Sequence, residues 1–182
     1  MNKLIVLSGP SGVGKGTIVK QLLKRGGYAL SVSCTTRSPR EGEKEGVSYF
    51  FITERKFGEM AEKGGFLEYS RHFGHGYGTP KAFVEKQLVN HDVILEIEVD
   101  GALQVKKAYP DALLIMIVPP DEEELKARLI KRGSETSQSI AERLSRNAYE
   151  LSKRPFYDYT VVNDDLQTAV EEIDGIIKSS KK

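Results

Sequence analysis

The stretch from Leu4 to Thr17, LIVLSGPSGVGKGT, combines closely spaced glycines with one lysine in a pattern suited to binding phosphate. Such glycines let successive backbone N–H groups curl around an anion, and a helix that begins there adds its positive end. Lys15 supplies a mobile ammonium for the outer phosphates of a nucleotide. We therefore predict a nucleotide-binding loop, against the alternative of a plain glycine-rich turn. Its predicted ATP-binding residues are Gly9, Pro10, Ser11, Gly12, Val13, Gly14, Lys15, Gly16 and Thr17.

One position departs from the usual pattern G-x-x-x-x-G-K-[ST]. The residue after Lys15 normally carries a hydroxyl that contacts Mg²⁺, but here it is Gly16, and a threonine follows only at Thr17. Either Thr17 takes over part of the hydroxyl's role, or phosphates and water hold most of the metal. Mg²⁺ tolerates the second arrangement because it keeps several waters. We predict Mg²⁺ as the cofactor, with Thr17 as its candidate protein ligand.

A loop further along the chain carries charges that suit an anionic ligand. The stretch SVSCTTRSPREGEKEGVSYFF (31–51) places Arg37 and Arg40 around a proline, with Tyr49 nearby. Two guanidinium groups and a phenol can clamp a phosphate dianion through forked, charge-assisted hydrogen bonds. The alternative is an exposed basic loop without a ligand.

A carboxylate within an apolar segment is a further candidate for that site. Glu68 lies in FLEY, ahead of Tyr77 and Thr79. The alternative is that Glu68 only faces solvent from an otherwise buried strand.

Strand-like and helix-like segments alternate along most of the chain. The expected strands, which are short apolar runs, are Lys3–Ser8, Asp92–Val99, Ala112–Val118 and Tyr159–Val162. The expected helices, which have helical spacing of apolar residues, are Lys15–Lys24, Pro80–Asn90, Ala102–Ala108, Asp121–Arg132, Ser137–Lys153 and Leu166–Lys178. This alternation predicts an α/β fold with a parallel sheet and helices on both faces.

Residues 33–78 break the alternation, since they are rich in glycine, arginine, threonine and aromatic residues, with short β-like pieces at Ser48–Ile52 and Phe66–Arg71. We expect a small mixed insertion there, and a core formed by residues 1–32 and 79–182.

Composition excludes several classes of protein. The chain has 182 residues, and 27 Lys and Arg against 26 Asp and Glu give a net charge of +1, so nothing draws the whole molecule toward nucleic acid or membrane. The longest apolar run, Ala112–Val118, is too short to span a bilayer. The N-terminus lacks the pattern of a signal peptide, and Cys34 is the single cysteine. We therefore expect a cytoplasmic protein without nucleic-acid or membrane partners, as a monomer or a homo-oligomer.

With these motifs in order, the sequence resembles the guanylate kinase family over nearly its whole length. The resemblance rests on GPSGVGKGT, whose GKGT is a variant found in nucleoside monophosphate kinases, and on later motifs. These are SVSCTTRSPREGE, GVSYFF, FLEYSRHFGHGYGTP, EIEVDGA, RGSET followed by ERL, and VVNDD. The resemblance implies a P-loop NTPase-type core with a GMP-binding insertion at 33–78 and a mobile lid within about 121–150. It also implies transfer of the γ-phosphoryl group of ATP to GMP.

The resemblance also implies roles for individual residues. The clamp for the GMP phosphate would be Arg37, Arg40, Tyr49 and Tyr77, and the guanine would be read by Ser33, Glu68 and Thr79. The lid arginines would be Arg132 and Arg143, and Asn163 would lie near the ATP adenine. The residues expected to carry catalysis by positioning and charge neutralisation are Lys15, Arg37, Arg132 and Arg143.

The segment EIEVDG departs from the family pattern. Glu98 stands where an acid contacts guanine or the metal's surroundings, but Asp100 occupies a position that is usually glutamine. Asp100 could serve only as a helix N-cap.

Several alternatives stay open from the sequence. Another P-loop kinase, adenylate kinase above all, is one, and a non-catalytic guanylate-kinase-like binding domain is another. For the histidines, the cysteine and two of the tyrosines, we expect roles in the structure and not in the chemistry. We expect His72 and His75 to be structural or surface residues, Cys34 to be a packed side chain, and Tyr157 and Tyr159 to lie in the core.

Overall fold

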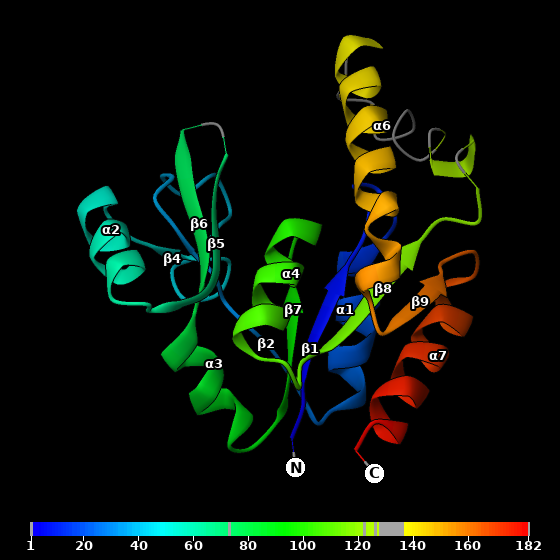
Figure 1. Cartoon of the computed structure of the whole chain (residues 1–182), viewed down its shortest axis with the longest axis horizontal. Helices are drawn as coiled ribbons and strands as arrows, with labels where there is room; N and C mark the ends of the chain where they lie inside the picture. The colour runs from blue at the N-terminus through cyan, green and yellow to red at the C-terminus, as the bar shows by residue number, and fades with distance from the viewer. Residues whose placement is uncertain (1, 73, 122, 126, 128–136, 182) are drawn as a thin grey trace.

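The computed structural model describes residues 2–181 apart from 73, 122, 126 and 128–136, and over 137–143 it describes the backbone alone. Its larger sheet has five parallel strands in the order β2-β7-β1-β8-β9 (Figure 1). These strands are β1 (Leu4–Ser8), β2 (Tyr28–Leu30), β7 (Asp92–Glu96), β8 (Leu113–Val118) and β9 (Tyr159–Val162). The P-loop α/β fold predicted from the sequence is confirmed.

Alternate residues of β1 belong to hydrophobic clusters on opposite faces of this sheet. Ile5 and Leu7 share a cluster with the apolar faces of two helices, α1 (Lys15–Arg25) and α7 (Leu166–Ser179). Leu4 and Val6 share the other cluster with α3 (Lys81–Leu88) and α4 (Val99–Ala108). Helices thus cover both faces, and because β1 is buried throughout, the loop that follows it starts from a fixed point.

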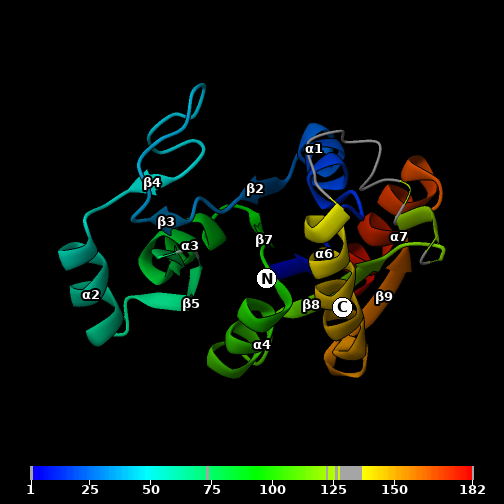
Figure 2. The same ribbon diagram turned by 90° about the horizontal axis from the view of Figure 1, so that it is seen from above.

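A second sheet of four strands, in the order β4-β3-β6-β5, lies beside the first (Figures 1 and 2). Its strands are β3 (Cys34–Thr35), β4 (Phe50–Phe51), β5 (Phe66–His72) and β6 (His75–Pro80), and it is mixed. Helix α2 (Glu54–Glu62) packs on it through a small cluster of Cys34, Phe57 and Phe66. The small sheet therefore has its own hydrophobic centre.

Several boundaries differ from the sequence prediction. The strand expected over Asp92–Val99 ends at Glu96, and α4 begins at Val99 with Glu98 as its N-cap residue, three residues before the predicted start. The sequence did not predict β2, α2 or β6. The short, half-buried β2 gives little apolar pattern, and glycines interrupt the pattern in β6. Tyr159 is 43% exposed, so its predicted place in the core is wrong.

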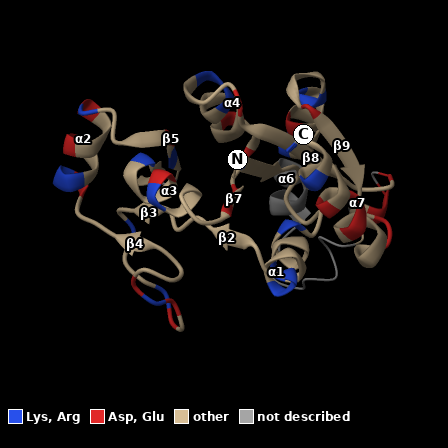
Figure 3. Cartoon of the chain, turned by 90° about the horizontal axis from the view of Figure 1, so that it is seen from below, with Lys and Arg blue, Asp and Glu red and all other residues tan. Residues whose placement is uncertain are grey.

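Helix α6 (Ser137–Ser152) rises beyond the strand ends of the larger sheet, opposite the small sheet (Figure 1). The helix predicted over Asp121–Arg132 lies partly outside the described residues. A short 3₁₀ turn, Arg154–Phe156, leads from α6 to β9. Charged residues of both signs are spread over the helices and loops, while the strands carry few (Figure 3). In the part of the chain that the structure describes, no helix has the length and apolar character needed to cross a membrane.

Candidate active site

The segment Gly9–Thr17, named here the phosphate loop, connects the end of β1 to the start of α1. Gly9, Gly12 and Gly14 have φ values of 141°, 89° and 100°, which L-residues with side chains rarely adopt. Lys15 Nζ donates to Gly9 O at 2.5 Å and to Pro10 O at 3.0 Å, so its ammonium folds back over the loop. A cavity of about 360 Å³ opens here, lined by Ser11, Gly12, Gly14, Lys15, Gly16, Thr17, Lys20 and Glu96.

Gly16, the residue that breaks the usual motif, lies against Glu96. A Cβ at position 16 would be 3.4 Å from Glu96 Oε1, which is van der Waals contact, so a serine or threonine there would lie directly beside the carboxylate. Glu96 is paired with Leu7 in the β1–β7 register, which brings it to the end of β1. Desolvation raises the pKa of Glu96, and the charges of Lys15 and Lys20 oppose that shift. Glu96 therefore belongs to this site.

A second cavity of about 340 Å³ lies between the small sheet and the start of α4, and is named here the inter-sheet cavity. The predicted site residues among its lining are Ser33, Arg40, Tyr49, Glu68, Tyr77 and Glu98. The sequence did not single out Ser70, His72, Glu96 and Ile97 for this site, although all four line the cavity. The structure thus brings together residues from Ser33 to Gly101, which are far apart in the sequence.

Glu68 is buried at the edge of this cavity, with 7% of the residue exposed, so the alternative that it faces solvent is wrong. Thr79 Oγ1 donates to Glu68 Oε1 at 2.6 Å, and Ser33 Oγ lies 3.5 Å from Thr79 Oγ1. Burial raises the pKa of Glu68, hydrogen bonds from Thr79 lower it, and the charge of Glu98 raises it. A Cβ at Gly101 would lie 2.8 Å from Glu68 Oε2, so the first turn of α4 packs directly against this carboxylate.

The two arginines of the predicted clamp differ in their surroundings. Arg37 is nearly buried and forms a forked pair with Glu43, with Nη1 to Oε2 at 2.8 Å and Nη2 to Oε1 at 2.9 Å. Its guanidinium also lies over the ring of Tyr49, 5.4 Å from the centroid. Arg40 is exposed, its backbone N–H donates to Glu43 Oε2 at 2.8 Å, and its side chain reaches the inter-sheet cavity. The alternative of a fully exposed basic loop is therefore wrong for Arg37.

Glu43 is a residue of this region that sequence reasoning missed. The hydrogen bonds from the Arg37 guanidinium, together with the one from the Arg40 backbone, lower the pKa of Glu43 to about 2. The available signal in the sequence was an acid three residues after Arg40, in a loop with two arginines. The pair fixes the Arg37 guanidinium in place, and Arg37 Nε is buried without a hydrogen-bond partner among the described residues.

The candidates from the C-terminal half have different outcomes. Arg132 lies outside the described residues, and of Arg143 only the backbone, within α6, is described. Asn163 is buried, and its Nδ2 donates to Val13 O at 2.7 Å in the phosphate loop. A Cβ at Gly14 would lie 2.5 Å from that nitrogen, so Asn163 supports the loop. Its proposed proximity to adenine stays a prediction.

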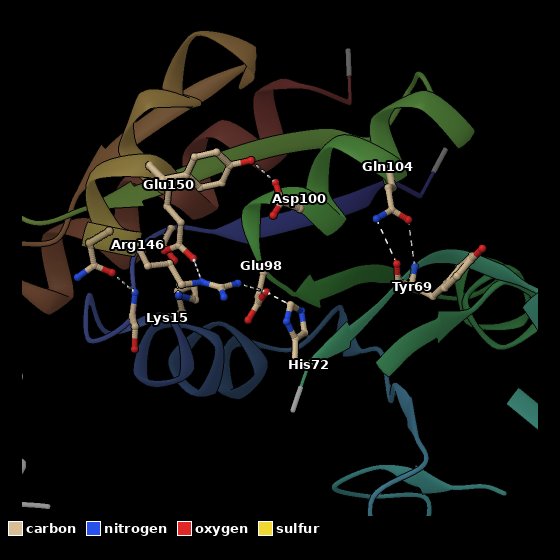
Figure 4. A network of polar contacts seen from close by, with 12 residues as sticks. Lys15, Tyr69, His72, Glu98, Asp100, Gln104, Arg146 and Glu150 are labelled. Atoms are coloured by element: carbon tan, nitrogen blue, oxygen red, sulfur yellow. Dashed lines mark hydrogen bonds and ion pairs between the residues drawn. The ribbon is translucent and has the colours of Figure 1, made fainter. Parts of the chain in front are cut away.

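Asp100 is not the N-cap residue of α4, because that position belongs to Glu98. Asp100 instead lies in the first turn, lines the inter-sheet cavity and accepts a hydrogen bond from Tyr149 Oη at 2.8 Å (Figure 4). The structure therefore excludes the open possibility that Asp100 is only the helix N-cap.

His72, predicted as a structural or surface residue, lines the inter-sheet cavity, and Cys34, predicted as a packed side chain, is buried. Among the described residues, no three His, Cys, Asp or Glu side chains gather in a way that could hold a metal. His72 Nε2 lies 3.1 Å from Glu98 Oε2. Cys34 is packed in the small sheet, and burial raises the pKa of its thiol to about 11, as expected for an inert side chain.

Comparisons with known proteins agree with this geometry. A protein-family model described as guanylate kinase matches residues 1–180. The guanylate kinase of Clostridioides difficile is 51% identical over 98% of this chain and 88% of its own length. That of Thermus thermophilus is 45% identical over 99% of this chain and 82% of its own length. The chain belongs to the guanylate kinase family.

A solved structure supports the same family membership. The crystal structure of guanylate kinase from Anaplasma phagocytophilum matches with a TM-score of 0.74 and 31% identity, covering 98% of this chain and 85% of that one. Guanylate kinases phosphorylate GMP with ATP, and the chain is an enzyme of this activity. This outcome sets aside the adenylate kinase and non-catalytic alternatives.

Proposed function

We propose that ATP places its phosphates in the phosphate loop and that GMP binds in the inter-sheet cavity. The observation that carries this assignment is that the two cavities share a wall, since Glu96 lines both. In-line phosphoryl transfer requires the attacking phosphate oxygen and the γ-phosphate to meet directly, with no protein nucleophile between them. Two adjoining cavities satisfy this requirement.

The guanine would be read by the polar groups at the closed end of the inter-sheet cavity. Guanine offers N1–H and the 2-amino group as donors, which the carboxylates of Glu68 and Glu98 accept. The hydroxyl of Ser33 would donate to O6, and Thr79, whose hydroxyl donates to Glu68, would hold that carboxylate toward the base. Adenine presents an acceptor at N1 and a donor at position 6, so it would leave buried polar groups unpaired.

The phosphate of GMP would be held by Arg37, Arg40, Tyr49 and Tyr77. The rings of Tyr49 and Tyr77 meet edge to face with centroids 6.1 Å apart, and both line the cavity. Glu43 takes one N–H from each terminal nitrogen of Arg37, so the remaining N–H groups of Arg37 and the exposed guanidinium of Arg40 would be the donors to the phosphate. A prearranged arginine loses less side-chain entropy when a phosphate arrives.

Catalysis would come from positioning and charge neutralisation. Lys15 would contact the β- and γ-phosphates, and the lid arginines Arg132 and Arg143 would close over them. The oxygen donors beside the phosphate loop, Thr17 and Glu96, are of the kind that Mg²⁺ prefers, so the site fits a magnesium ion. When bound with ATP, this ion supplies charge neutralisation at the phosphates.

We further propose which segments of the chain bind GMP, form the core and form the lid. Residues 33–78 form the GMP-binding insertion, residues 1–32 and 79–182 form the core, and the lid lies within about 121–150. The insertion and the lid approach each other when both nucleotides are bound, because ligand phosphates offset the repulsion between their arginines. The enzyme acts in the cytoplasm on ATP and GMP, without nucleic acid or membrane.

A coupled assay of ADP release tests this proposal. With Mg²⁺ and ATP, we expect ADP release to require GMP, to be weaker with IMP and to be negligible with AMP. Chelation of Mg²⁺ by EDTA should stop the reaction, and added MgCl₂ should restore it. ADP release that proceeds equally without an acceptor, or with AMP, would contradict the assignment of the inter-sheet cavity.

A further inference from the structure

The carboxylate of Glu98 is contacted from two other elements. Arg146 Nη2, on α6, lies 2.5 Å from Glu98 Oε2, and His72 Nε2, on β5, lies 3.1 Å from the same oxygen (Figure 4). Neither contact uses Oε1, and the Glu98 side chain is half-exposed where it lines the inter-sheet cavity. Oε2 is therefore bonded to Arg146 of α6 and lies near His72 of the small sheet, while neither of these two residues occupies Oε1.

The charges around the cavity explain why an arginine is useful here. Four carboxylates line it, those of Glu68, Glu96, Glu98 and Asp100. Burial raises the pKa of Glu68, and the negative charge of Glu98 adds to the shift. A cavity that also receives a phosphate dianion needs positive charge beside these acids. Arg146 is outside the lining, so it offsets the charge of Glu98 without filling the space for the base.

The same turn of α6 also contacts the phosphate loop. The backbone N–H of Ser11 donates to Asn147 Oδ1 at 3.2 Å. Arg146 Nε donates to Glu150 Oε1 at 3.3 Å, and the charge of Lys15 acts on Glu150 (Figure 4). Consecutive residues of α6, Arg146 and Asn147, thus bond to one lining residue of each cavity, Glu98 and Ser11. Arg143, the proposed lid arginine, precedes Arg146 by less than one turn of this helix.

We propose that Arg146 is a positioning residue for recognition of the acceptor base. Its ion pair holds Oε2 of Glu98 so that Oε1 is presented to the guanine, and it ties that carboxylate to α6. This inference rests on the proposed function, because it requires Glu98 to contact the base.

A double-mutant cycle of Arg146→Ala and Glu98→Gln tests the proposal, with KM and kcat measured for GMP, IMP and ATP. Since the pair is half-exposed, we expect Arg146→Ala to raise the KM for GMP by about three- to tenfold. The GMP-over-IMP preference should fall, while the KM for ATP changes by less than about twofold. In the Glu98→Gln background, Arg146→Ala should have no further effect on the KM for GMP.

Two further variants separate positioning from a general role in folding. Arg146→Lys should recover part of the loss, since lysine keeps the charge but not the fork. Tyr149→Phe removes the neighbouring hydrogen bond between α6 and Asp100, and should leave the KM for GMP at the wild-type value. Thermal unfolding of each variant shows whether it is folded at the assay temperature.

The outcomes distinguish the role of Arg146 from the proposed contact of Glu98 with guanine. If Arg146→Ala raises the KM for GMP equally in both backgrounds, or raises the KM for ATP as much, Arg146 does not act through Glu98 and the proposal is overturned. If Glu98→Gln impairs GMP while Arg146→Ala does not, only the role of Arg146 fails. If Glu98→Gln has no effect on GMP or on the GMP/IMP ratio, the proposed contact of Glu98 with guanine fails as well.

Discussion

The phosphate loop and the inter-sheet cavity differ in how the chain builds them. The phosphate loop is one continuous stretch of nine residues, from Gly9 to Thr17, whose glycines and lysine fix the chemistry together with the conformation. The inter-sheet cavity collects side chains from residues 33 to 101, on strands, loops and a helix start. A local site depends on a few irreplaceable residues, whereas an assembled site distributes recognition over many. Single substitutions should therefore have unequal effects in the two regions.

The largest effect is expected in the phosphate loop. Lys15→Ala removes the mobile ammonium, and we expect kcat to fall by about a thousandfold, as for other preorganised charges in transition-state sites. The Lys15 ammonium lies over the loop, where it donates to the carbonyls of Gly9 and Pro10 and not into the hydrophobic core, so the fold should persist. The measurement is ATP-dependent GDP formation, with circular dichroism as the folding control. Near-normal turnover would show that the phosphate loop does not depend on this lysine, and would contradict the difference drawn between the two regions.

The next effect concerns the base. Glu68→Gln replaces an acceptor-only group with one that also donates, so it should lower the preference for GMP over IMP by about tenfold or more. The comparison to make is kcat/KM for GMP, IMP and AMP in both proteins. An unchanged GMP/IMP ratio would show that another group, such as Glu98, reads the 2-amino group.

What could be predicted from the sequence also differs between the phosphate loop and the inter-sheet cavity. The phosphate loop, β1 and the alternating core were predicted because their signals are local. Glu96 was missed as a site residue because its role comes from Gly16, which is distant in sequence and is brought near by the β1–β7 register. Glu43 was missed because its role comes from a turn that lets it form the forked pair with Arg37. The start of α4 was misplaced because the acids Glu98 and Asp100 interrupt its apolar pattern. Which of two acids caps a helix depends on backbone conformation that residue types alone leave open.

A smaller effect is expected at the phosphate clamp. Arg37→Lys and Arg40→Lys keep the charge but lose the forked geometry, so each should weaken GMP binding by about tenfold. Binding of ATP should change much less, because the phosphate loop is untouched. Calorimetric titration with each nucleotide makes the comparison, and unchanged GMP affinity in both variants would show that the phosphate binds elsewhere. We expect Arg37→Lys to be the more costly, since Arg37 is the nearly buried one.

The smallest effect is on stability. Arg37 and the Arg40 backbone hold the pKa of Glu43 at about 2, below its ordinary value of 4.5. A depressed carboxylate pKa stabilises the fold above the ordinary value and loses that contribution as the pH falls toward 2. Wild type should therefore be more stable than Glu43→Gln above about pH 5, with the difference shrinking between pH 4.5 and 2. Urea unfolding at pH 7 and pH 3 measures it, with Glu59→Gln, in the exposed Arg55 pair, as the matched control.

The contact between Gly101 and Glu68 limits how this enzyme can be re-engineered. A side chain of any size at position 101 would push against the carboxylate, since even a Cβ would lie 2.8 Å from Oε2. A mutant library aimed at a new acceptor base therefore gains little from varying Gly101 alone. Random substitution there changes the depth of the cavity and the position of Glu68 at the same time, so size and polarity cannot be selected separately. Libraries that vary Ser33 and Ser70, which also line the cavity, with Gly101 kept constant, would separate those two properties.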